Sequence, residues 1–224
     1  IEDVERTMAL NFFELFGIGA QAKMGTVSYK IRNSLYLNLT QRCTADCVFC
    51  TRLTKPVVQG YNLALDREPT ATEVWESIDD VKKYDEVVFC GFGEPTLRLD
   101  VIKEVAKKVK DNGGRVRLNT NGHGDVINKR NILPELSGLI DEVSVSLNTD
   151  SSEAYDQICQ PLPKFRNGIY EKIKEFIEEA KRHIPDVQAS IVTHQNGVDE
   201  SNCEEIVNKE FGVKYRARRY NIVG

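Results

Sequence analysis

Long hydrophobic runs are missing from this sequence. No apolar stretch approaches the roughly 18 residues that suggest a membrane-spanning helix, and the first residues lack the charged-then-apolar order of a secretory signal. We therefore expect the protein in the cytoplasm, where thiols stay reduced. Its six cysteines are then better explained as metal ligands or catalytic groups than as disulfide partners.

An excess of charge of either sign is also missing. The chain has 30 basic and 34 acidic residues, for a net charge of −4, and the two signs are interspersed. Without a basic patch, non-specific binding to nucleic acid is not favoured. A length of 224 residues suits one main domain with a single core.

What the sequence does contain, from Ser34 onward, is an alternation of short β-branched runs with longer amphipathic stretches. This alternation is typical of βαβ units on a parallel sheet. Six units fall short of the eight that close a full barrel. We therefore expect an α/β fold of the partial (βα)6 TIM-like barrel type, an open parallel sheet of six strands with helices outside. The candidate strands are 34–40, 86–90, 115–120, 142–149, 187–193 and 213–220.

Three amphipathic stretches predict helices that cover the sheet, beginning near Thr70, Asp100 and Gly168. Thr70 has Glu73 three residues later, which is the capping-box spacing. The second stretch stops at Gly113, where glycine can adopt the left-handed C-cap conformation. Residues 52–69 match neither the helical nor the strand period, and we expect a long functional loop there, because structureless loops above about 12–15 residues are usually functional or disordered.

Three cysteines fall within eight positions of the stretch NLTQRCTADCVFCTR, residues 38–52. Cys43, Cys47 and Cys50 follow the first predicted strand directly, and ligand sites of α/β barrels and open sheets lie at the carboxyl ends of the strands. Structural zinc takes four ligands, usually Cys or His, and no fourth is offered locally. An iron–sulfur cluster normally uses four thiolates; with three, one iron stays open to a small molecule.

This CxxxCxxC spacing, after the first strand of a six-unit βα chain, resembles the radical S-adenosylmethionine (radical SAM) superfamily. The resemblance implies a 4Fe–4S cluster on Cys43, Cys47 and Cys50, whose open iron chelates the amino and carboxylate groups of S-adenosylmethionine (SAM). It also implies reductive cleavage of SAM, which releases a 5′-deoxyadenosyl radical. In such enzymes the protein binds and orients while the cofactor supplies the chemistry.

A second motif follows the second predicted strand. The sequence GFGEP, with Gly91, Phe92, Gly93 and Glu94, resembles the GGEP motif of the same superfamily, with Phe92 in place of the second glycine. The resemblance implies that this segment holds the methionyl ammonium of SAM. A carboxylate suits that cation, and glycines let backbone carbonyls approach a ligand closely. The alternative is an ordinary glycine-rich turn between a strand and a helix.

Further SAM contacts are expected at the ends of other strands. Phe49 matches the aromatic position of the family loop that lies near the adenine, and Asn119 stands where some family members have an acid. Ser146 and Asn148 share a strand face by alternation and would bind the ribose or the carboxylate. Val192 would pack against the adenine. Core packing is the alternative for Phe49 and Val192, and an ordinary strand-end hydrogen bond is the alternative for the polar residues.

Other polar and sulfur-bearing residues are less informative. Arg216 and Arg218 share one face of the last predicted strand, where they would bind the SAM carboxylate or an anionic substrate, or form an outward salt-bridged face. His123 follows the third predicted strand, and we expect a solvated loop histidine. The remaining cysteines lie far apart without CxxC spacing, which favours buried small side chains over an auxiliary cluster: Cys90, Cys159 and Cys203.

The first residues do not belong to the βα pattern. Residues 1–17 form an amphipathic pattern that ends at Gly17 and resemble the C-terminal helix of TatD-like metal-dependent hydrolases; residues 34–100 resemble the small TatD-linked radical SAM proteins. We therefore interpret 1–33 as an N-terminal helix and linker left from an upstream hydrolase domain, and 34–224 as the radical SAM domain. An ordinary N-terminal helix packed against the barrel is the alternative.

The sequence thus predicts a radical SAM enzyme with one 4Fe–4S cluster, acting on an unidentified small molecule or protein. It would take electrons from a donor such as flavodoxin or ferredoxin, and a fused or neighbouring TatD-like hydrolase is an expected partner. Two alternatives stay open. One is an activase that abstracts hydrogen from a partner protein, as glycyl-radical activating enzymes do, and the other is a non-catalytic zinc or iron–sulfur binding module.

Overall fold

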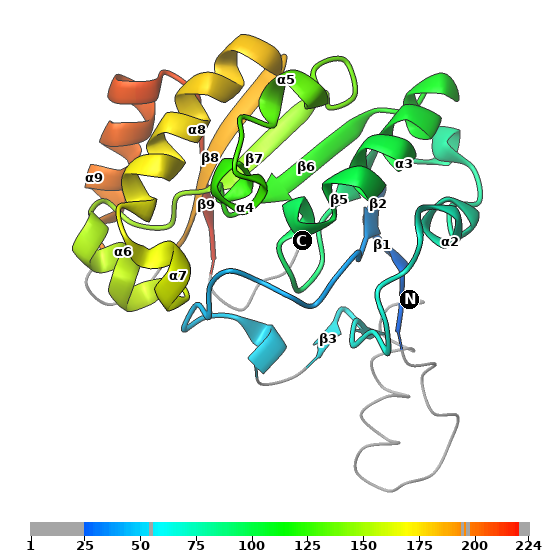
Figure 1. Ribbon diagram of the computed structural model, residues 1–224, viewed down its shortest axis with the longest axis horizontal. Coiled ribbons are helices and arrows are strands. Elements are labelled where there is room, and N and C mark those ends of the chain that lie inside the picture. Colours follow the sequence, from blue (N-terminus) through cyan, green and yellow to red (C-terminus); the bar gives the residue numbers. More distant parts are fainter. Residues whose placement is uncertain (1–24, 54–55, 194, 196–197, 220–224) are drawn as a thin grey trace, which may run out of the picture.

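The protein is built around one curved sheet of seven strands (Figure 1). The computed structural model describes residues 25–53, 56–193, 195 and 198–219. From one edge to the other the strands are β1 (Ser28–Ile31), β2 (Ser34–Leu37), β5 (Glu86–Phe89), β6 (Val116–Thr120), β7 (Glu142–Ser146), β8 (Asp186–Val192) and β9 (Lys214–Arg218).

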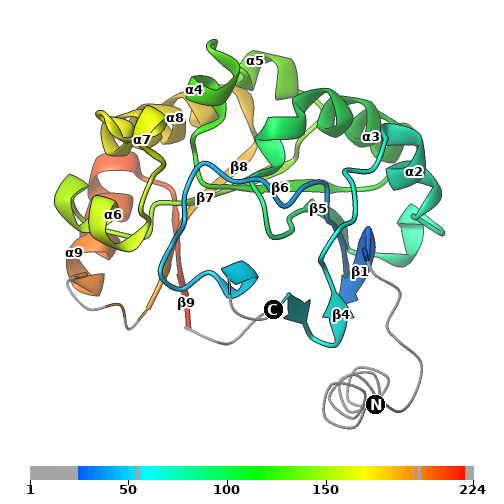
Figure 2. The ribbon, with the colours of Figure 1, turned by 60° about the horizontal axis from the view of Figure 1, so that its bottom comes forward.

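The six predicted parallel strands are confirmed, and their order in the sheet is their order in the chain. The seventh strand, β1, was not predicted. It pairs antiparallel with β2 through a tight turn in which Arg32 has a φ of 55°. Its four residues are too few to give a period, which is why alternation missed them. Among the described residues β1 and β9 do not pair, so the sheet is open between these two edges (Figure 2).

Helices cover the outer, convex face of the sheet (Figure 2). They are α2 (Ala71–Glu76), α3 (Leu99–Asp111), α4 (Gly124–Asn128), α5 (Leu133–Leu136), α6 (Ser152–Ile158), α7 (Pro163–Arg166), α8 (Ile169–His183) and α9 (Glu200–Glu205), with a π-helical segment at Ile206–Phe211. The capping box of Thr70 and Glu73 is present. Gly113 has the expected positive φ of 79° just after α3.

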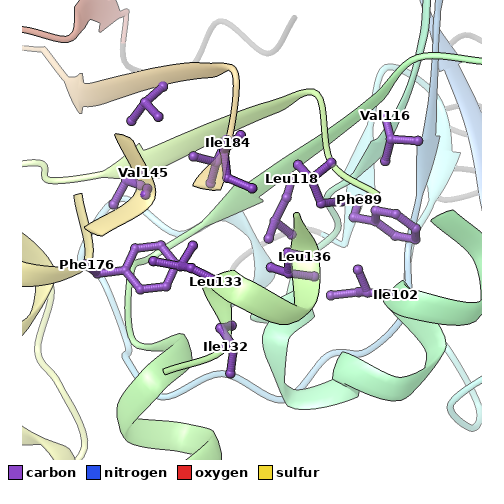
Figure 3. Close-up of a cluster of buried hydrophobic side chains, with 14 of the residues drawn as sticks. Phe89, Ile102, Val116, Leu118, Ile132, Leu133, Leu136, Val145, Phe176 and Ile184 are labelled. Carbon is purple, nitrogen blue, oxygen red and sulfur yellow. The ribbon is translucent and has the colours of Figure 1, made fainter. Parts of the chain in front are cut away.

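The two faces of the sheet differ in chemistry. On the outer face Phe89, Leu118 and Val145 are fully buried against helix residues such as Ile102 and Phe176, and they form the main core (Figure 3). The inner face carries polar and aromatic side chains at the alternate strand positions, namely Tyr36, Arg117, Asn119, Ser144, Ser190 and Arg216. The inside of a closed TIM barrel is packed with branched apolar residues, so a polar inner face indicates a cavity.

Residues 52–69 are more regular than expected. They contain a small hairpin of two-residue strands, β3 (Val57–Val58) and β4 (Tyr61–Asn62). The buried Asn38 side chain ties this segment to the sheet, because its Nδ2 donates to the carbonyl of Leu63 at 2.9 Å. The loop is therefore held as part of the inner wall.

The predicted helix at 1–17 lies outside the described residues. Strand β1 precedes the boundary at 33/34 and still belongs to the same sheet as β2. Within the part of the chain that is described, no helix combines the length and the apolar character needed to cross a bilayer.

Candidate functional site

A cavity of about 320 Å³ lies on the inner face of the sheet, at the carboxyl ends of the parallel strands. Its lining includes every residue expected from the sequence to contact a metal or SAM: Cys43, Cys47, Cys50, Phe49, Gly91, Phe92, Gly93, Glu94, Asn119, Ser146, Asn148 and Val192. The ends of four strands (β5, β6, β7 and β8) and the segment after β2 contribute to this set, so the fold gathers residues up to 149 positions apart, from Cys43 to Val192. Their individual roles stay predictions.

The cysteine loop, residues 41–52, is held by its backbone. Asp46 N donates to the Gln160 carbonyl at 3.1 Å, and Val48 N donates to the Ile158 carbonyl at 2.9 Å, so the loop lies along the end of α6. Arg52 bridges within the loop, with one Nη atom 2.6 Å from Asp46 Oδ1. The three thiols are thereby presented to the cavity by a braced loop.

The GFGEP segment is hydrogen-bonded to the residues at the start of the cysteine loop. Gly93 N donates to the Thr40 carbonyl at 3.0 Å and Glu94 N donates to the Arg42 carbonyl at 2.9 Å. A Cβ on Gly93 would overlap both carbonyl oxygens, and a Cβ on Gly91 would overlap the Asn38 side chain. The glycines are therefore required by the contact between these two segments, a reason that the sequence did not reveal.

Glu94 is a buried carboxylate, 2 % exposed, that is held by uncharged donors. Its Oε1 accepts from the Thr96 and Thr120 hydroxyls, each at 2.7 Å, while Oε2 accepts the Asn121 N–H at 2.8 Å. Burial raises the pKa of Glu94, and these donors oppose the rise because they favour the ionised form. With one donor on Oε2, the carboxylate has a free acceptor position for a cationic group in the cavity.

The three cavity thiols are candidate metal ligands. Burial and the adjacent Glu94 raise the pKa of Cys43 to about 12, so a cation is needed to stabilise its thiolate. Among the described residues, no three His, Cys, Asp or Glu side chains converge on one ion. Zinc needs its sulfur ligands at about 2.3 Å from one centre, whereas each thiolate of an iron–sulfur cube binds a different iron and the sulfurs lie farther apart.

Cys47 has a second thiol beside it. A hydrogen bond with Cys159, followed by burial, raises the pKa of Cys47. Cys159 is fully buried and also accepts from Asn148 Nδ2 at 3.5 Å. Cys203 is buried as expected, while Cys90 lines the cavity.

His123 is buried, so the expectation of a solvated loop histidine is wrong. Its Nδ1 lies 2.7 Å from the Thr44 hydroxyl and its Nε2 lies 2.9 Å from the Tyr155 hydroxyl. Asn121 Nδ2 donates to the same Thr44 oxygen at 2.9 Å. The histidine thus braces the cysteine loop from behind, and burial lowers its pKa to about 3.

The polar residues at the strand ends differ in how fully they are bonded. Asn119 Oδ1 already accepts from Arg117 Nη1 at 3.3 Å. Ser146 Oγ lies 3.5 Å from Arg218 Nη2, at the limit of a hydrogen bond. Asn148 has a left-handed backbone, with φ of 64°, and its Oδ1 is buried without a partner in the described structure. Of these three residues, Asn148 is therefore the one whose side-chain oxygen can accept a hydrogen bond from a ligand without losing a described partner.

Sequence reasoning missed several residues of the lining. Ser190 and Arg117 lie on the inner face of predicted strands, and alternation alone could have assigned both. Tyr29 and Tyr36 also line the cavity, and their ring centroids lie 5.4 Å apart. Tyr29 lies on the unpredicted β1, so no pattern pointed to it.

The fold and the site define an α/β enzyme with a cofactor pocket at the carboxyl ends of its parallel strands, where thiols from one loop meet a buried carboxylate. A family model, the Radical SAM superfamily, matches residues 37–209. This is more than half of the chain, and the chain belongs to the radical SAM superfamily. Enzymes of this superfamily use a 4Fe–4S cluster and SAM, and they require a reductant and a substrate.

Two archaeal relatives illustrate the breadth of the superfamily. An uncharacterised protein of Methanocaldococcus jannaschii, MJ0804, is 32% identical over 120 residues, which are 53% of this chain and 35% of that protein. A second protein of that organism, MJ1227, is provisionally named a glycyl-radical enzyme activating enzyme; it is 27% identical over 82% of this chain and 70% of its own length. The chain therefore spans about a third of the first relative.

Solved structures share the fold at low sequence identity. The structure of TYW1 with a lysine–pyruvate adduct bound has a TM-score of 0.61 at 14% identity, over 96% of this chain and 73% of that one. Streptococcus suis SuiB bound to S-adenosylmethionine has a TM-score of 0.59 at 16% identity, over 84% of this chain and 40% of that one. These likenesses support the architecture alone.

Proposed function

We propose that this chain is a radical SAM enzyme in which Cys43, Cys47 and Cys50 bind the 4Fe–4S cluster and Glu94 binds the ammonium of SAM. When bound and reduced, the cluster cleaves SAM and supplies a 5′-deoxyadenosyl radical that takes hydrogen from a substrate. The observation that carries the proposal is the pair of backbone hydrogen bonds that join the GFGEP segment to Thr40 and Arg42. A structural metal site would not need a buried carboxylate held against its cysteine loop.

The remaining strand-end residues would hold the adenosyl part of SAM. Asn148 Oδ1, buried without a partner in the described structure, is suited to accept from a ribose hydroxyl. Val192 and Phe49 give the apolar surface that an adenine ring packs on. Ser146 and Asn119 would add polar contacts. For Asn119, the contact with SAM would replace its hydrogen bond with Arg117.

The finer assignments rest on the sequence. We propose that the radical SAM domain, predicted at 34–224, also includes β1, which pairs with β2. The part of 1–33 before β1 would then be a helix and linker left from a TatD-like hydrolase, which would be fused or encoded nearby. A cytoplasmic location and a flavodoxin or ferredoxin as the electron donor complete this proposal. Sequencing the parent reading frame tests the fusion, because the absence of a hydrolase domain upstream of Ile1 would refute it.

Anaerobic reconstitution with iron and sulfide tests the enzyme itself. We expect a brown protein with about four irons per chain, which forms 5′-deoxyadenosine from SAM when dithionite is added. Replacing Cys43, Cys47 and Cys50 together by alanine should abolish both the iron and the product, whereas Cys203→Ala, which removes a buried thiol outside the cavity lining, should retain them. A colourless, zinc-loaded protein that forms no 5′-deoxyadenosine would instead support the non-catalytic binding module.

Activation of a partner protein is the second candidate, and the similarity to MJ1227 favours it. An activating enzyme would transfer its radical to a glycine of another polypeptide. Electron paramagnetic resonance of the reduced enzyme with SAM and each candidate partner would then show a persistent radical on the partner. Deuterium transfer from a labelled small molecule into 5′-deoxyadenosine, without such a radical, would exclude the activase.

A further inference from the structure

Apart from Arg117 on β6, the charged residues that line the cavity follow β5 or belong to β9 and the residue after it. Glu94 follows β5, and Arg216 and Arg218 lie on β9, at the far edge of the sheet from β1 (Figure 2). If Glu94 binds the ammonium of SAM, the carboxylate of the cavity has its ligand. The two arginines of β9 are then left without an assigned ligand.

The half-buried Arg216 and Arg218 of β9 differ from Arg117, the buried arginine of the cavity. Arg117 is neutralised by Glu86 through two bonds, Nη2 to Oε1 at 2.7 Å and Nε to Oε2 at 3.0 Å. Within the described residues Arg216 and Arg218 form no ion pair with any carboxylate. A guanidinium cannot lose its proton in a protein, so both sites carry a full positive charge.

Arg218 has the stronger need for an anion. Its Nε is buried and has no hydrogen-bond partner in the described structure, and the only hydrogen bond described for its side chain is the 3.5 Å contact from Nη2 to Ser146. Burial lowers the pKa of Arg218, and the strongest charge interactions on it come from Cys90, Arg216, Cys47 and Tyr36. A guanidinium without a counter-charge is unfavourable where its solvation is reduced, so this arrangement makes sense if a ligand supplies the counter-charge.

Hydroxyl groups accompany the two arginines. The register of the sheet sets Ser146 beside Ser190 and Ser190 beside Arg216, while Val192 pairs with Arg218. All of these side chains line the cavity. With Ser146 assigned to SAM, two guanidinium groups and the Ser190 hydroxyl make a set of donors that matches the oxygens of a carboxylate or phosphate.

An apolar wall faces this donor set. Tyr29, Ile31, Val58, Leu63 and Phe92 pack together, with Tyr36 and Tyr61 against them. These residues come from β1, β2, the β3–β4 hairpin and the GFGEP segment, and five of them line the cavity together with Tyr36. Flat or apolar groups are stabilised by such aromatic surfaces.

The space beside the donor set suits a small molecule. A second hollow of about 220 Å³, nearer the amino ends of the strands, shares Tyr36, Arg117 and Arg216 with the main cavity. Arg216 therefore lies where the two hollows meet. The main cavity is at the lower end of the roughly 300–1,000 Å³ found for ligand pockets, so with SAM bound little room is left for a large substrate.

We propose that Arg218 and Arg216, with Ser190, form a substrate subsite for the oxyanion of a small organic acid whose flat or apolar body lies against the Tyr29–Tyr36 wall. This inference rests on the proposed function, because it takes the Glu94 side of the cavity to be the SAM side. The substrate class it names is a small carboxylate or phosphate ester.

Isothermal titration calorimetry under anaerobic conditions tests the subsite. The protein is first reconstituted, shown to form 5′-deoxyadenosine, and saturated with SAM in the oxidised state. The probes are phenyl phosphate, benzoate and phenol, which share a flat ring and differ in charge. We expect the better of the two anions to bind at least about tenfold more tightly than phenol, a difference of about 1.4 kcal/mol. Tighter benzoate binding assigns a carboxylate substrate, and tighter phenyl phosphate binding assigns a phosphate.

Three variants give the test its controls. Arg218→Met should weaken anion binding at least tenfold. Arg218→Lys keeps the positive charge but loses the two parallel N–H donors of the guanidinium, so it should weaken anion binding less. Lys214→Met removes a positive charge from the same strand, where Lys214 is exposed and paired with Asp186 outside the cavity; anion affinity should stay within about twofold. A thermal melt of each variant excludes loss of folding.

Three results would overturn the proposal. The first is that phenol binds as tightly as both anions, and the second is that Arg218→Met binds the anions as well as the parent. The third is that the anions displace SAM, since Arg218 would then belong to the SAM carboxylate. Failure of the proposed function itself would appear earlier, as a protein without iron or without 5′-deoxyadenosine.

Discussion

The Thr44 hydroxyl lies 2.7 Å from His123 Nδ1, which links the cysteine loop to the end of β6. Asn121 Nδ2 donates to the same hydroxyl oxygen, and His123 Nε2 lies 2.9 Å from the Tyr155 hydroxyl. Both ring partners are hydroxyls, which can donate or accept, so the neutral ring is hydrogen-bonded at both nitrogens. A protonated ring would carry its charge in a buried site, where loss of solvation disfavours it.

This arrangement predicts an acid-sensitive stability. Burial lowers the pKa of His123 to about 3, against about 6.5 in the unfolded chain. Between these values the unfolded state binds a proton that the folded state does not, so the free energy of unfolding falls as the pH falls, by about 1.4 kcal/mol per unit below 6.5. Urea denaturation should show a loss of about 2 kcal/mol from pH 6.5 to 5.

His123→Gln should remove that slope, and His183→Gln, on the outer helix α8, should keep it. Two exposed ion pairs do not add to the change in the free energy of unfolding between pH 6.5 and 5. Arg67 and Arg130 lower the pKa values of Glu73 and Glu135 to about 2, so their contribution is lost only as the pH falls below about 4.5. An unchanged slope in His123→Gln would contradict the buried neutral histidine.

Glu94→Gln should weaken SAM binding by about 10- to 100-fold, because a charge-assisted hydrogen bond of roughly 1.5–3 kcal/mol is lost. The amide would also set its NH2 group against the Asn121 N–H or the two hydroxyls, so some loss of thermal stability is expected as well. Thr96→Val is the matched control, since it removes one donor to the carboxylate and keeps the charge. Equal SAM affinities in Glu94→Gln and the parent would exclude the ammonium role.

Gly93→Ala should displace the cysteine loop. The added Cβ would overlap the Thr40 and Arg42 carbonyl oxygens, which belong to the backbone and cannot rotate away. We expect low iron content after reconstitution and a lower melting temperature. Gly138→Ala has nothing within 4 Å of its added Cβ and a φ of 75°, so it should cost only the backbone strain of about 1–2 kcal/mol and retain the iron. Full iron content in Gly93→Ala would contradict the packing reason for this glycine.

Arg218→Met should raise the melting temperature of the protein without ligands. The variant removes a half-buried cation whose Nε is buried and which lacks a carboxylate partner in the described structure, and each 1 kcal/mol gained corresponds to about 2–4 °C for a chain of this size. Functional groups commonly lower stability in this way. Differential scanning calorimetry measures the shift; a fall of several degrees would show that Arg218 is a structural residue.

The sequence predicted most of the sheet, because its six parallel strands are β-branched runs between amphipathic helices, and that pattern is local. It predicted the cysteine loop and the GFGEP segment for a similar reason, since each is a short motif next to a strand end. It failed at β1, whose four residues hold no period and pair only because β2 lies beside them. It also failed at His123, whose burial depends on Thr44 and Tyr155 from distant parts of the chain.

Taken alone, the sequence determined the family, the cysteine motif that carries the resemblance and the alternation that sets which strand residues share a face. The tertiary structure decided which charges are left unpaired. Arg117 and Arg218 both lie on inner faces of strands, but Arg117 meets Glu86 from the neighbouring β5 while Arg218 lies on the edge strand β9 and meets no described carboxylate. Whether an arginine is neutralised depends on its distance from a carboxylate in space, and only the folded sheet sets that distance.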